Sequence, residues 1–333
     1  MAATASAARV KGLDLGTSRI VLAELHGENT NFEVQLNAFV TLPLSNMTKS
    51  MLEREGILHF VEDSQIIAYG NRVDDFANML SGDTQRPMQT GLLNAAEPKS
   101  LQIVELAIEN ICGPARKGEK ITFSVPSTTP ENESDLIYHQ QAITQLLENL
   151  GYKVQSVNEG LAVVYSELME SDFTGFGISF GAGLCNVCFA HLGLPVLTFC
   201  MTRAGDYIDR CAASVTGETL TNLRLYKERD FSLTGFTSVK VDQALSVYYD
   251  DVIQGVVRGI EQQFAESKKI PNLNHPVPVA FAGGTARVGG FQAALQEALE
   301  SADLPIEISV VRLSKDPLNT TAKGTFVAAA TNM

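Results

Sequence analysis

Long apolar runs and basic clusters are both missing from this sequence of 333 residues. Its longest apolar stretches, such as residues 160–165 and 327–330, fall far short of the roughly 20 residues that a membrane-spanning helix needs. Acidic residues outnumber basic ones by 38 to 25, which gives a net charge of −13. No Lys- or Arg-rich run focuses positive charge toward a phosphate backbone. We therefore expect a soluble protein that binds no nucleic acid and has no direct membrane anchor.

Cysteine and histidine are scarce and scattered, with five residues of each. An odd number of cysteines in a long chain argues against a disulfide framework and favours a reducing compartment. Cys185 and Cys188 form a CxxC motif in a strand-like segment, where residues three apart point to opposite faces, and no second pair completes a metal site. Residues 1–8 lack the basic and Leu-rich regions of a secretory signal. These features predict a cytoplasmic protein.

Several familiar site motifs are also absent. The sequence has no GxxxxGK[ST] phosphate loop, no GxGxxG that opens a helix after a strand, and no HExxH metal motif. A GxSxG motif does occur at residues 177–181, with Ser179 at its centre. The segment after it is rich in β-formers, which predicts strand, turn, strand instead of the strand, turn, helix of a hydrolase nucleophile elbow. A serine hydrolase is therefore disfavoured.

Apolar periodicity predicts a similar order of elements in both halves of the chain. In the first half we expect strands at 10–25 (a hairpin), 32–42, 57–69 (two short pieces) and 121–125, with helices at 99–111 and 133–150. In the second half we expect strands within 175–190 and at 195–202, 277–282 and 306–312, with helices at 206–214, 238–268, 290–301 and from about 321. The repetition predicts a duplicated α/β architecture with a ligand cleft between its halves.

Three glycine-bearing turns can bring backbone N–H groups close to a phosphate or a flat ligand. Residues 14–18 end a strand with a carboxylate and present two hydroxyl groups. Residues 181–183 form a similar tip in the second half, and residues 283–285 follow a buried strand. Each turn alone is a weak signal, but their order and spacing are specific.

In this order the motifs resemble those of the actin-like ATPases, the superfamily of actin, heat-shock chaperones and sugar kinases, and within it the bacterial actins MreB and MamK. Residues 14–18 resemble the first phosphate motif, residues 181–183 the second, and residues 281–284 the adenosine motif. Further similar segments extend the likeness to essentially the whole chain: 68–72, 86–91, 124–126, 158–160, 202–206 and 322–324.

The resemblance implies an α/β, actin-like fold with two related domains, or four subdomains, around a nucleotide cleft. Domain I would comprise residues 9–153 and 313–333, with a small subdomain IB at about 33–72. Domain II would comprise residues 154–312, with a small subdomain IIB at about 215–240.

The resemblance also implies a site for ATP or ADP with Mg²⁺. Asp14 would hold the hydrated metal ion, and Glu159 would be the catalytic residue that orients the attacking water. Judged from the residues alone, Asp14 could instead be a solvated turn carboxylate and Glu159 an acid at a helix N-terminus. The residues implied to bind the nucleotide are Asp14, Gly16, Thr17, Ser18, Gly181, Ala182, Gly183, Gly205, Arg224, Gly283, Gly284 and Thr285.

The second phosphate motif departs from the family pattern, Asp-Ile/Leu-Gly-x-Gly-Thr-Thr-Asp. This chain has Ser179 at the first acid, Leu184 and Cys185 at the two threonines, and Asn186 at the last acid. The third glycine of the adenosine motif is Thr285. Backbone contacts to phosphate can survive these changes, whereas metal placement and hydrolysis suffer first. We therefore expect a weak ATPase.

The leading functional hypothesis is a bacterial actin-like cytoskeletal protein that binds ATP and Mg²⁺ and polymerises with itself into cytoplasmic filaments, serving unknown cargo or adaptor proteins. A second hypothesis is a non-polymerising adaptor or scaffold with the same fold, which would explain the altered second phosphate motif. A sugar-kinase-type phosphotransferase is disfavoured by the short length of the chain, because such kinases usually carry larger insertions.

Overall fold

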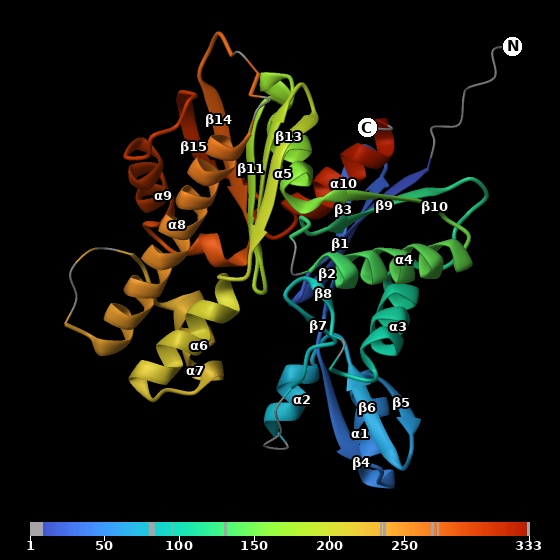
Figure 1. Ribbon diagram of the computed structural model, residues 1–333. Helices are drawn as coiled ribbons and strands as arrows, with labels where there is room; N and C mark the ends of the chain where they lie inside the picture. Colours follow the sequence, from blue (N-terminus) through green and yellow to red (C-terminus); the bar gives the residue numbers. More distant parts are fainter. Residues whose placement is uncertain are drawn as a thin grey trace, which may run out of the picture.

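The structure is a computed structural model that describes residues 9–331, except 80–83, 95, 130–131, 234, 236–237, 268–269 and 272. The N-terminal segment 1–8, and residues 234 and 236–237 of the expected subdomain IIB, lie outside the described residues. In the part described, two five-stranded sheets form two halves that stand side by side (Figure 1). The predicted duplicated α/β architecture is thereby confirmed.

The sheet of the first half has the strand order β10-β9-β1-β2-β3. Three strands form an antiparallel meander, and two more add to it in parallel. They are β1 (Val10–Leu15), β2 (Arg19–His26), β3 (Asn29–Leu36), β9 (Lys120–Val125) and β10 (Lys153–Asn158). Helices α3 (Ser100–Cys112) and α4 (Glu133–Asn149) bury apolar side chains such as Ile108 and Ile143 against one face of this sheet.

The second sheet repeats this topology with the order β13-β12-β11-β14-β15. Its meander is β11 (Gly175–Phe180), β12 (Cys185–His191) and β13 (Leu194–Met201), and its parallel strands are β14 (Val277–Ala282) and β15 (Ile308–Leu313). The largest core cluster lies between this sheet and the helices α6 (Gly205–Thr216), α8 (Lys240–Glu266) and α9 (Phe291–Glu300). Because both sheets share one topology, their first hairpins end in corresponding places.

Two helices lie between the sheets (Figure 1): α5 (Glu159–Glu167) and α10 (Thr320–Thr331). A Cβ atom on Gly324 of α10 would lie 1.8 Å from the Ala162 carbonyl oxygen of α5, so glycine is required for this close crossing. The crossing packs each helix against the other and ties the two halves together.

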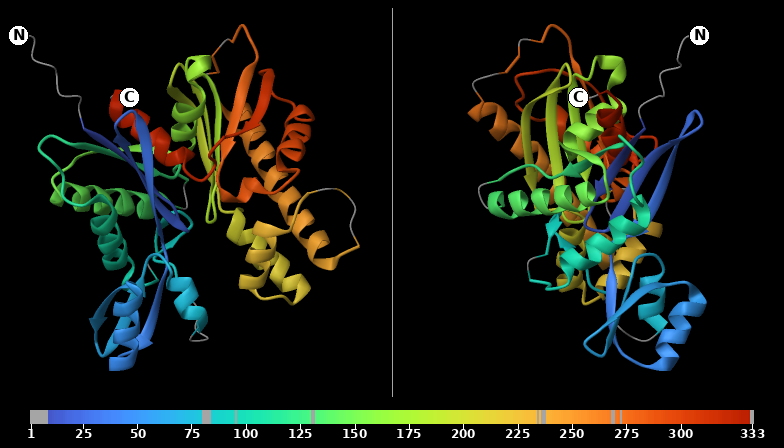
Figure 2. Two further views of the ribbon diagram at one scale, coloured as in Figure 1. Left: turned by 180° about the vertical axis from the view of Figure 1, so that it is seen from behind. Right: turned by 90° about the vertical axis from the view of Figure 1, so that its right-hand side faces the viewer.

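A small unit lies below the first sheet, at the same end as α6 and α7 (Leu220–Arg229) of the second half (Figures 1 and 2). It contains the sheet β4-β6-β5 with two helices. Their bounds are β4 (Phe39–Pro43), α1 (Asn46–Glu55), β5 (Leu58–Glu62), β6 (Gln65–Tyr69) and α2 (Val73–Met79). The hairpin of β7 (Met88–Gln89) and β8 (Leu92–Leu93) leads back to the first half, and two short 3₁₀ turns are Met169–Ser171 and Gly284–Arg287.

The expected single strand at 32–42 is wrong, because the chain forms β3 and β4 in two different sheets. Asn37 marks the break. Its backbone N–H donates to the Ser18 carbonyl at 3.0 Å, and its side-chain Nδ2 donates to the Gly16 carbonyl at 3.0 Å. These bonds to the turn between β1 and β2 redirect the chain out of the first sheet. Sequence patterning also did not identify α1, α2 and β10.

Candidate functional site

The turn between β1 and β2 places the Asp14 carboxylate in a pocket between the two halves. The turn closes with Gly16 N–H donating to the Arg19 carbonyl at 2.9 Å. Ser124 Oγ, near the end of the neighbouring β9, donates to Asp14 Oδ1 at 2.8 Å and accepts from Leu15 N–H at 3.0 Å. Burial raises the pKa of Asp14 to about 6. The bond from Ser124 therefore orients the half-buried carboxylate.

The turn between β11 and β12 forms the facing side of the pocket. Gly181 N–H donates to the Leu184 carbonyl at 2.9 Å, which closes the turn. The start of α6 is bonded to this turn, because Gly205 N–H donates to the Gly181 carbonyl at 3.1 Å and Asp206 N–H to the Ala182 carbonyl at 2.8 Å. Gly205 thus supports the turn through its backbone.

The two turns touch each other. A Cβ atom on Gly183 would lie 2.5 Å from Thr17 Oγ1 and 3.1 Å from the Thr90 backbone nitrogen, so only glycine fits there. Thr17 Oγ1 also accepts from the Gly91 N–H at 2.9 Å, which fixes the β7–β8 hairpin at the same point. The pocket is consequently narrow where the two turns meet.

Four other backbone amide groups at these two turns make no hydrogen bond within the described part of the chain. Among the described residues, the amide N–H groups of Thr17, Ser18, Ala182 and Gly183 have no protein acceptor. Clustered amide groups of this kind form concave sites for anions. The donor set therefore fits a phosphate chain lying between the two turns.

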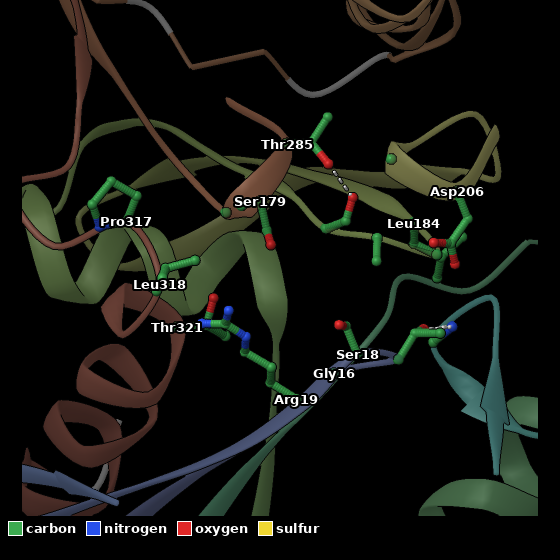
Figure 3. A pocket seen from close by; sticks show the side chains of 18 of the residues that line it. Gly16, Ser18, Arg19, Ser179, Leu184, Asp206, Thr285, Pro317, Leu318 and Thr321 are labelled. Carbon is green, nitrogen blue, oxygen red and sulfur yellow. Dashed lines mark hydrogen bonds between the residues drawn. The ribbon is translucent and has the colours of Figure 1, made fainter. Parts of the chain in front are cut away.

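The third glycine-bearing segment follows β14. Gly283 N–H donates to the Pro317 carbonyl at 2.8 Å, which joins the segment to the loop before α10. Thr285 Oγ1 donates to the Gly181 carbonyl at 2.8 Å, the bond drawn in Figure 3. Thr285 therefore ties this segment to the second turn, a role that a glycine could not fill.

Glu159 is the first residue of α5 and is buried. Asn158 caps the helix by accepting from the Leu161 N–H at 3.2 Å. The Glu159 carboxyl accepts a hydrogen bond from Asn186 Nδ2 at 2.9 Å. Burial, followed by the charge of Asp14, raises the pKa of Glu159 to about 8. Two coupled acids thus occupy one pocket.

Helices α6 and α7 contribute a charged wall. Lys227 Nζ lies 2.6 Å from Asp209 Oδ1, and both side chains are buried. Arg224 Nε lies 3.9 Å from Asp209 Oδ2 and is more exposed. Lys227 Nζ also donates to the Gly205 carbonyl at 3.3 Å. The Asp209–Lys227 pair was not identified from the sequence, because its members come from two helices and match no motif.

The structure brings every residue expected at the nucleotide to this one pocket (Figure 3). The expected residues lining it are Asp14, Gly16, Thr17, Ser18, Glu159, Gly181, Ala182, Gly183, Gly205, Arg224, Gly283, Gly284 and Thr285. Sequence reasoning missed other lining residues, including Arg19, Arg86, Asp206, Asp209, Lys227, Glu228, Arg287, Pro317, Leu318 and Thr321. Burial lowers the pKa of Arg86, and the Asp206 carboxylate offsets part of that effect.

The carboxyl groups suit a Mg²⁺ ion that is bound mainly by phosphate and water. The described residues contain no group of three or more His, Cys, Asp or Glu side chains that could hold a metal without such help. Mg²⁺ in phosphate sites usually takes only one or two protein carboxylates. Asp14 alone meets that requirement.

The two other sequence motifs have structural roles. Cys185 packs in the core beneath α8, whereas Cys188 packs with α5, so the two side chains lie on opposite faces of β12, as expected. Ser179 lies on β11, which continues through a turn into β12, and the predicted strand, turn, strand is confirmed. None of the described helices is long and apolar enough to cross a membrane.

Solved structures with the same overall fold include MamK, MreB5 and EutJ. A chain of the MamK double helical filament has a TM-score of 0.70 and 16% identity, covering 96% of this chain and 97% of its own. MreB5 of Spiroplasma citri bound to AMPPNP has a TM-score of 0.69 and 13% identity, covering 98% and 97%. The ethanolamine utilization protein EutJ of Carboxydothermus hydrogenoformans has a TM-score of 0.51 and 16% identity, covering 95% and 88%. The predicted actin-like fold is confirmed.

No curated protein sequence matches the chain. A family model described as Volactin matches residues 10–329, which include both sheets, α5 and most of α10. The chain therefore belongs to the Volactin family.

Proposed function

We propose that the chain is an actin-like cytoskeletal protein that binds ATP with Mg²⁺ in the pocket, polymerises into filaments and hydrolyses ATP slowly. One observation carries the proposal. Two turns with free amide groups meet beside the half-buried Asp14 and the buried Glu159. Amide donors and carboxylates placed together suit a phosphate chain with a bound cation.

The phosphates would lie between the two turns. The N–H groups of Thr17 and Ser18 would donate to them from the first half, and those of Ala182 and Gly183 from the second. A phosphate chain held from both sides favours a closed arrangement of the halves. Nucleotide binding would therefore be linked to the relative position of the two halves.

Asp14 and Glu159 would have different roles, one toward the metal ion and one toward the attacking water. Asp14, held by Ser124, would bind the hydration shell of Mg²⁺. The cation, when bound, offsets the negative charge of the phosphates. Glu159 would orient a water whose oxygen bonds to the γ-phosphorus as the bond to the β–γ bridging oxygen breaks. ADP leaves with that electron pair, and the released phosphate carries the water oxygen with both of its protons, one of which passes to solvent.

Hydrolysis should be slow, because the second turn lacks the acid and hydroxyl groups of the family pattern. Ser179, Leu184 and Cys185 are buried, and Leu184 brings an apolar side chain to this end of the pocket. Fewer polar groups are then available to place the metal and the water.

The nucleoside would occupy the other end of the pocket. Gly283, Gly284 and Thr285 would lie against the adenine from one side, and Arg224 on α7 would approach the ribose. Lys227 is paired closely with Asp209 in this wall, whereas Arg224 lies farther from Asp209. Of these two cations, Arg224 is therefore the better placed to bind the nucleotide.

Self-association is supported by the fold alone. One similar structure is the MamK double helical filament, and another is a non-polymerising MamK mutant bound to AMPPNP, with a TM-score of 0.57. We extend filament formation to this chain and place the filaments in the cytoplasm. We propose no nucleic-acid partner, since the net charge of −13 repels phosphate backbones.

A non-polymerising adaptor is the second candidate, and the replaced groups at Ser179, Leu184 and Cys185 favour it. Such an adaptor would bind nucleotide for stability or partner recognition without assembling. Both candidates share the ATP site and differ in self-association.

Calorimetric titration of ATP with Mg²⁺ tests the shared site. Arg224→Ala should weaken ATP binding at least about 10-fold, the effect of losing one hydrogen bond to a charged group. Arg229→Ala is the matched control, because Arg229 is exposed at the end of the same helix and does not line the pocket. Failure of the unmodified protein to bind ATP, or equal losses in both variants, would refute the site.

A further inference from the structure

Asn186 on β12 connects the two halves through both ends of its side-chain amide. The residue is fully buried, with 0% exposure. Its Nδ2 donates to Glu159 Oε2 at 2.9 Å, and its Oδ1 accepts from the Ser127 N–H at 3.0 Å. Because both Nδ2 and Oδ1 of Asn186 are hydrogen-bonded, the amide is fixed in one orientation. The amide in turn fixes the position of the Glu159 carboxyl oxygen that it contacts.

Ser127 belongs to the first half, two residues after β9, and is 2% exposed. Its hydroxyl accepts from Asn158 Nδ2 at 2.8 Å. Its carbonyl accepts from Asn132 Nδ2 at 3.2 Å and from Cys200 Sγ at 3.2 Å. Every polar group of Ser127 is therefore bonded, and the bonds from Asn186 and Cys200 come from the second half.

The network also reaches Glu159 through its backbone. Asn158 bonds Ser127 with its Nδ2 and caps α5 with its Oδ1, so Glu159 begins a helix whose start is fixed by the same serine. Glu159 is thus held at its carboxyl group by Asn186 and at its backbone by Asn158. Both restraints meet at Ser127.

A buried polar network of this kind is not needed for core stability alone. Buried polar groups stabilise a fold only when all are satisfied, and apolar side chains of similar volume often do as well or better. The neutral amide of Asn186 can donate to Glu159, whereas an aspartate at this position could only accept. The residue type therefore matches the task of holding a carboxyl group.

We propose that Asn186 is the positioning residue for Glu159, and that it links the closed arrangement of the two halves to the orientation of this acid. The proposal rests on the slow ATP hydrolysis proposed above. Separation of the halves would break the Ser127–Asn186 bond and free the amide. Closure of the halves around nucleotide restores the bond and fixes the Glu159 carboxyl.

Single-turnover hydrolysis of bound ATP tests this role. Asn186→Ala should lower the hydrolysis rate about 10-fold, the usual effect of losing one buried hydrogen bond, with ATP affinity changed less than about 2-fold. Asn186→Leu retains the side-chain volume and should show the same loss of rate. It serves as the second variant if Asn186→Ala does not fold. Asn132→Ala is the matched control, because Asn132 also bonds Ser127 but does not contact Glu159.

The Glu159→Gln background separates positioning from structure. There, adding Asn186→Ala should change the remaining rate less than about 2-fold, because the group that Asn186 positions is gone. Equal rate losses in both backgrounds, a loss as large in Asn132→Ala, or a large loss of ATP affinity would overturn the inference. Absence of Glu159-dependent hydrolysis in an unmodified protein that binds ATP would also overturn it. Absence of ATP binding would instead refute the proposed function itself.

Discussion

Asp14 and Glu159 present a simple problem of charge. Both carboxyl groups line one pocket, and their pKa values are raised to about 6 and about 8. The charge of an ionised Asp14 opposes ionisation of Glu159. Near neutral pH the two carboxyl groups together therefore carry about one negative charge. Bound Mg²⁺ would favour the ionised form of both groups.

The raised pKa of Glu159 predicts a pH-dependent stability. Its ordinary value is 4.5, so the neutral buried acid stabilises the fold fully below about pH 4.5. That contribution is lost as the pH rises through about 8. Glu159→Gln keeps a neutral side chain at every pH. Without nucleotide or divalent cations, its melting temperature should match the unmodified protein near about pH 5 and exceed it by a few degrees near about pH 8.5.

Scanning fluorimetry of both proteins across this range measures the difference. A constant offset would show that Glu159 is already ionised in the fold. A difference in melting temperature that shrinks with rising pH would show that folding lowers the pKa of Glu159.

Asp14→Ala should weaken Mg-ATP binding at least about 10-fold, because the carboxylate that holds the metal hydration shell is removed. The difference should disappear when Mg²⁺ is chelated, since the amide contacts to phosphate remain. Glu28→Ala, which removes an exposed acid of the β2–β3 turn, is the charge-matched control. Unchanged Mg-ATP affinity in Asp14→Ala would contradict the assignment of Asp14.

The three glycine-bearing turns could be located from the sequence, because their small residues and a strand-ending acid form a local pattern. The sequence does not reveal that Arg86, Asp209 and Lys227 line the pocket. They come from a loop and two helices that only tertiary packing brings together. Asn186 could be recognised as a departure from a motif, but its two partners are 27 and 59 residues away. A contact of that kind leaves no periodic signal.

At the scale of elements, helices α5 and α10 cross closely between the two sheets. Gly324→Ala would bring a Cβ to 1.8 Å from the Ala162 carbonyl oxygen, which neither helix backbone can avoid without moving. The substitution should destabilise the protein by about 2–4 kcal/mol in urea unfolding.

Gly255→Ala in α8 is the matched control for that substitution. Its Cβ would meet only the flexible Met201 side chain, 3.3 Å away, and the change should stay within about 1 kcal/mol of the unmodified protein. Similar losses in both variants would show that helix propensity, and not the crossing, sets the cost.

Most hairpins and long helices were predictable because they are amphipathic or alternate cleanly. Helix α3, for example, buries Ile108 and Ile111 on one side. Helix α5 was harder to recognise because its residues 159–165 are all buried, so its sequence has no polar face. Strand β3 could not be separated from β4 because the break at Asn37 depends on bonds to a distant turn.

For the whole molecule, the net charge of −13 sets a condition on assembly. Like-charged copies repel over distances comparable to the Debye length, about 10 Å at 0.1 M salt. Raising KCl from about 50 to about 200 mM, or adding divalent cations, should therefore lower the critical concentration for assembly. Light scattering against protein concentration measures it. A critical concentration that rises with salt would indicate that attractive charge pairs dominate the contact.

The most direct test of the account is electron microscopy with sedimentation of the purified protein, with Mg-ATP and without nucleotide. We expect filaments that sediment when Mg-ATP is present. Asp14→Ala should form no filaments and should remain in the supernatant at the same protein concentration. A protein that binds Mg-ATP but remains dispersed at high concentration would contradict polymerisation and favour the non-polymerising adaptor.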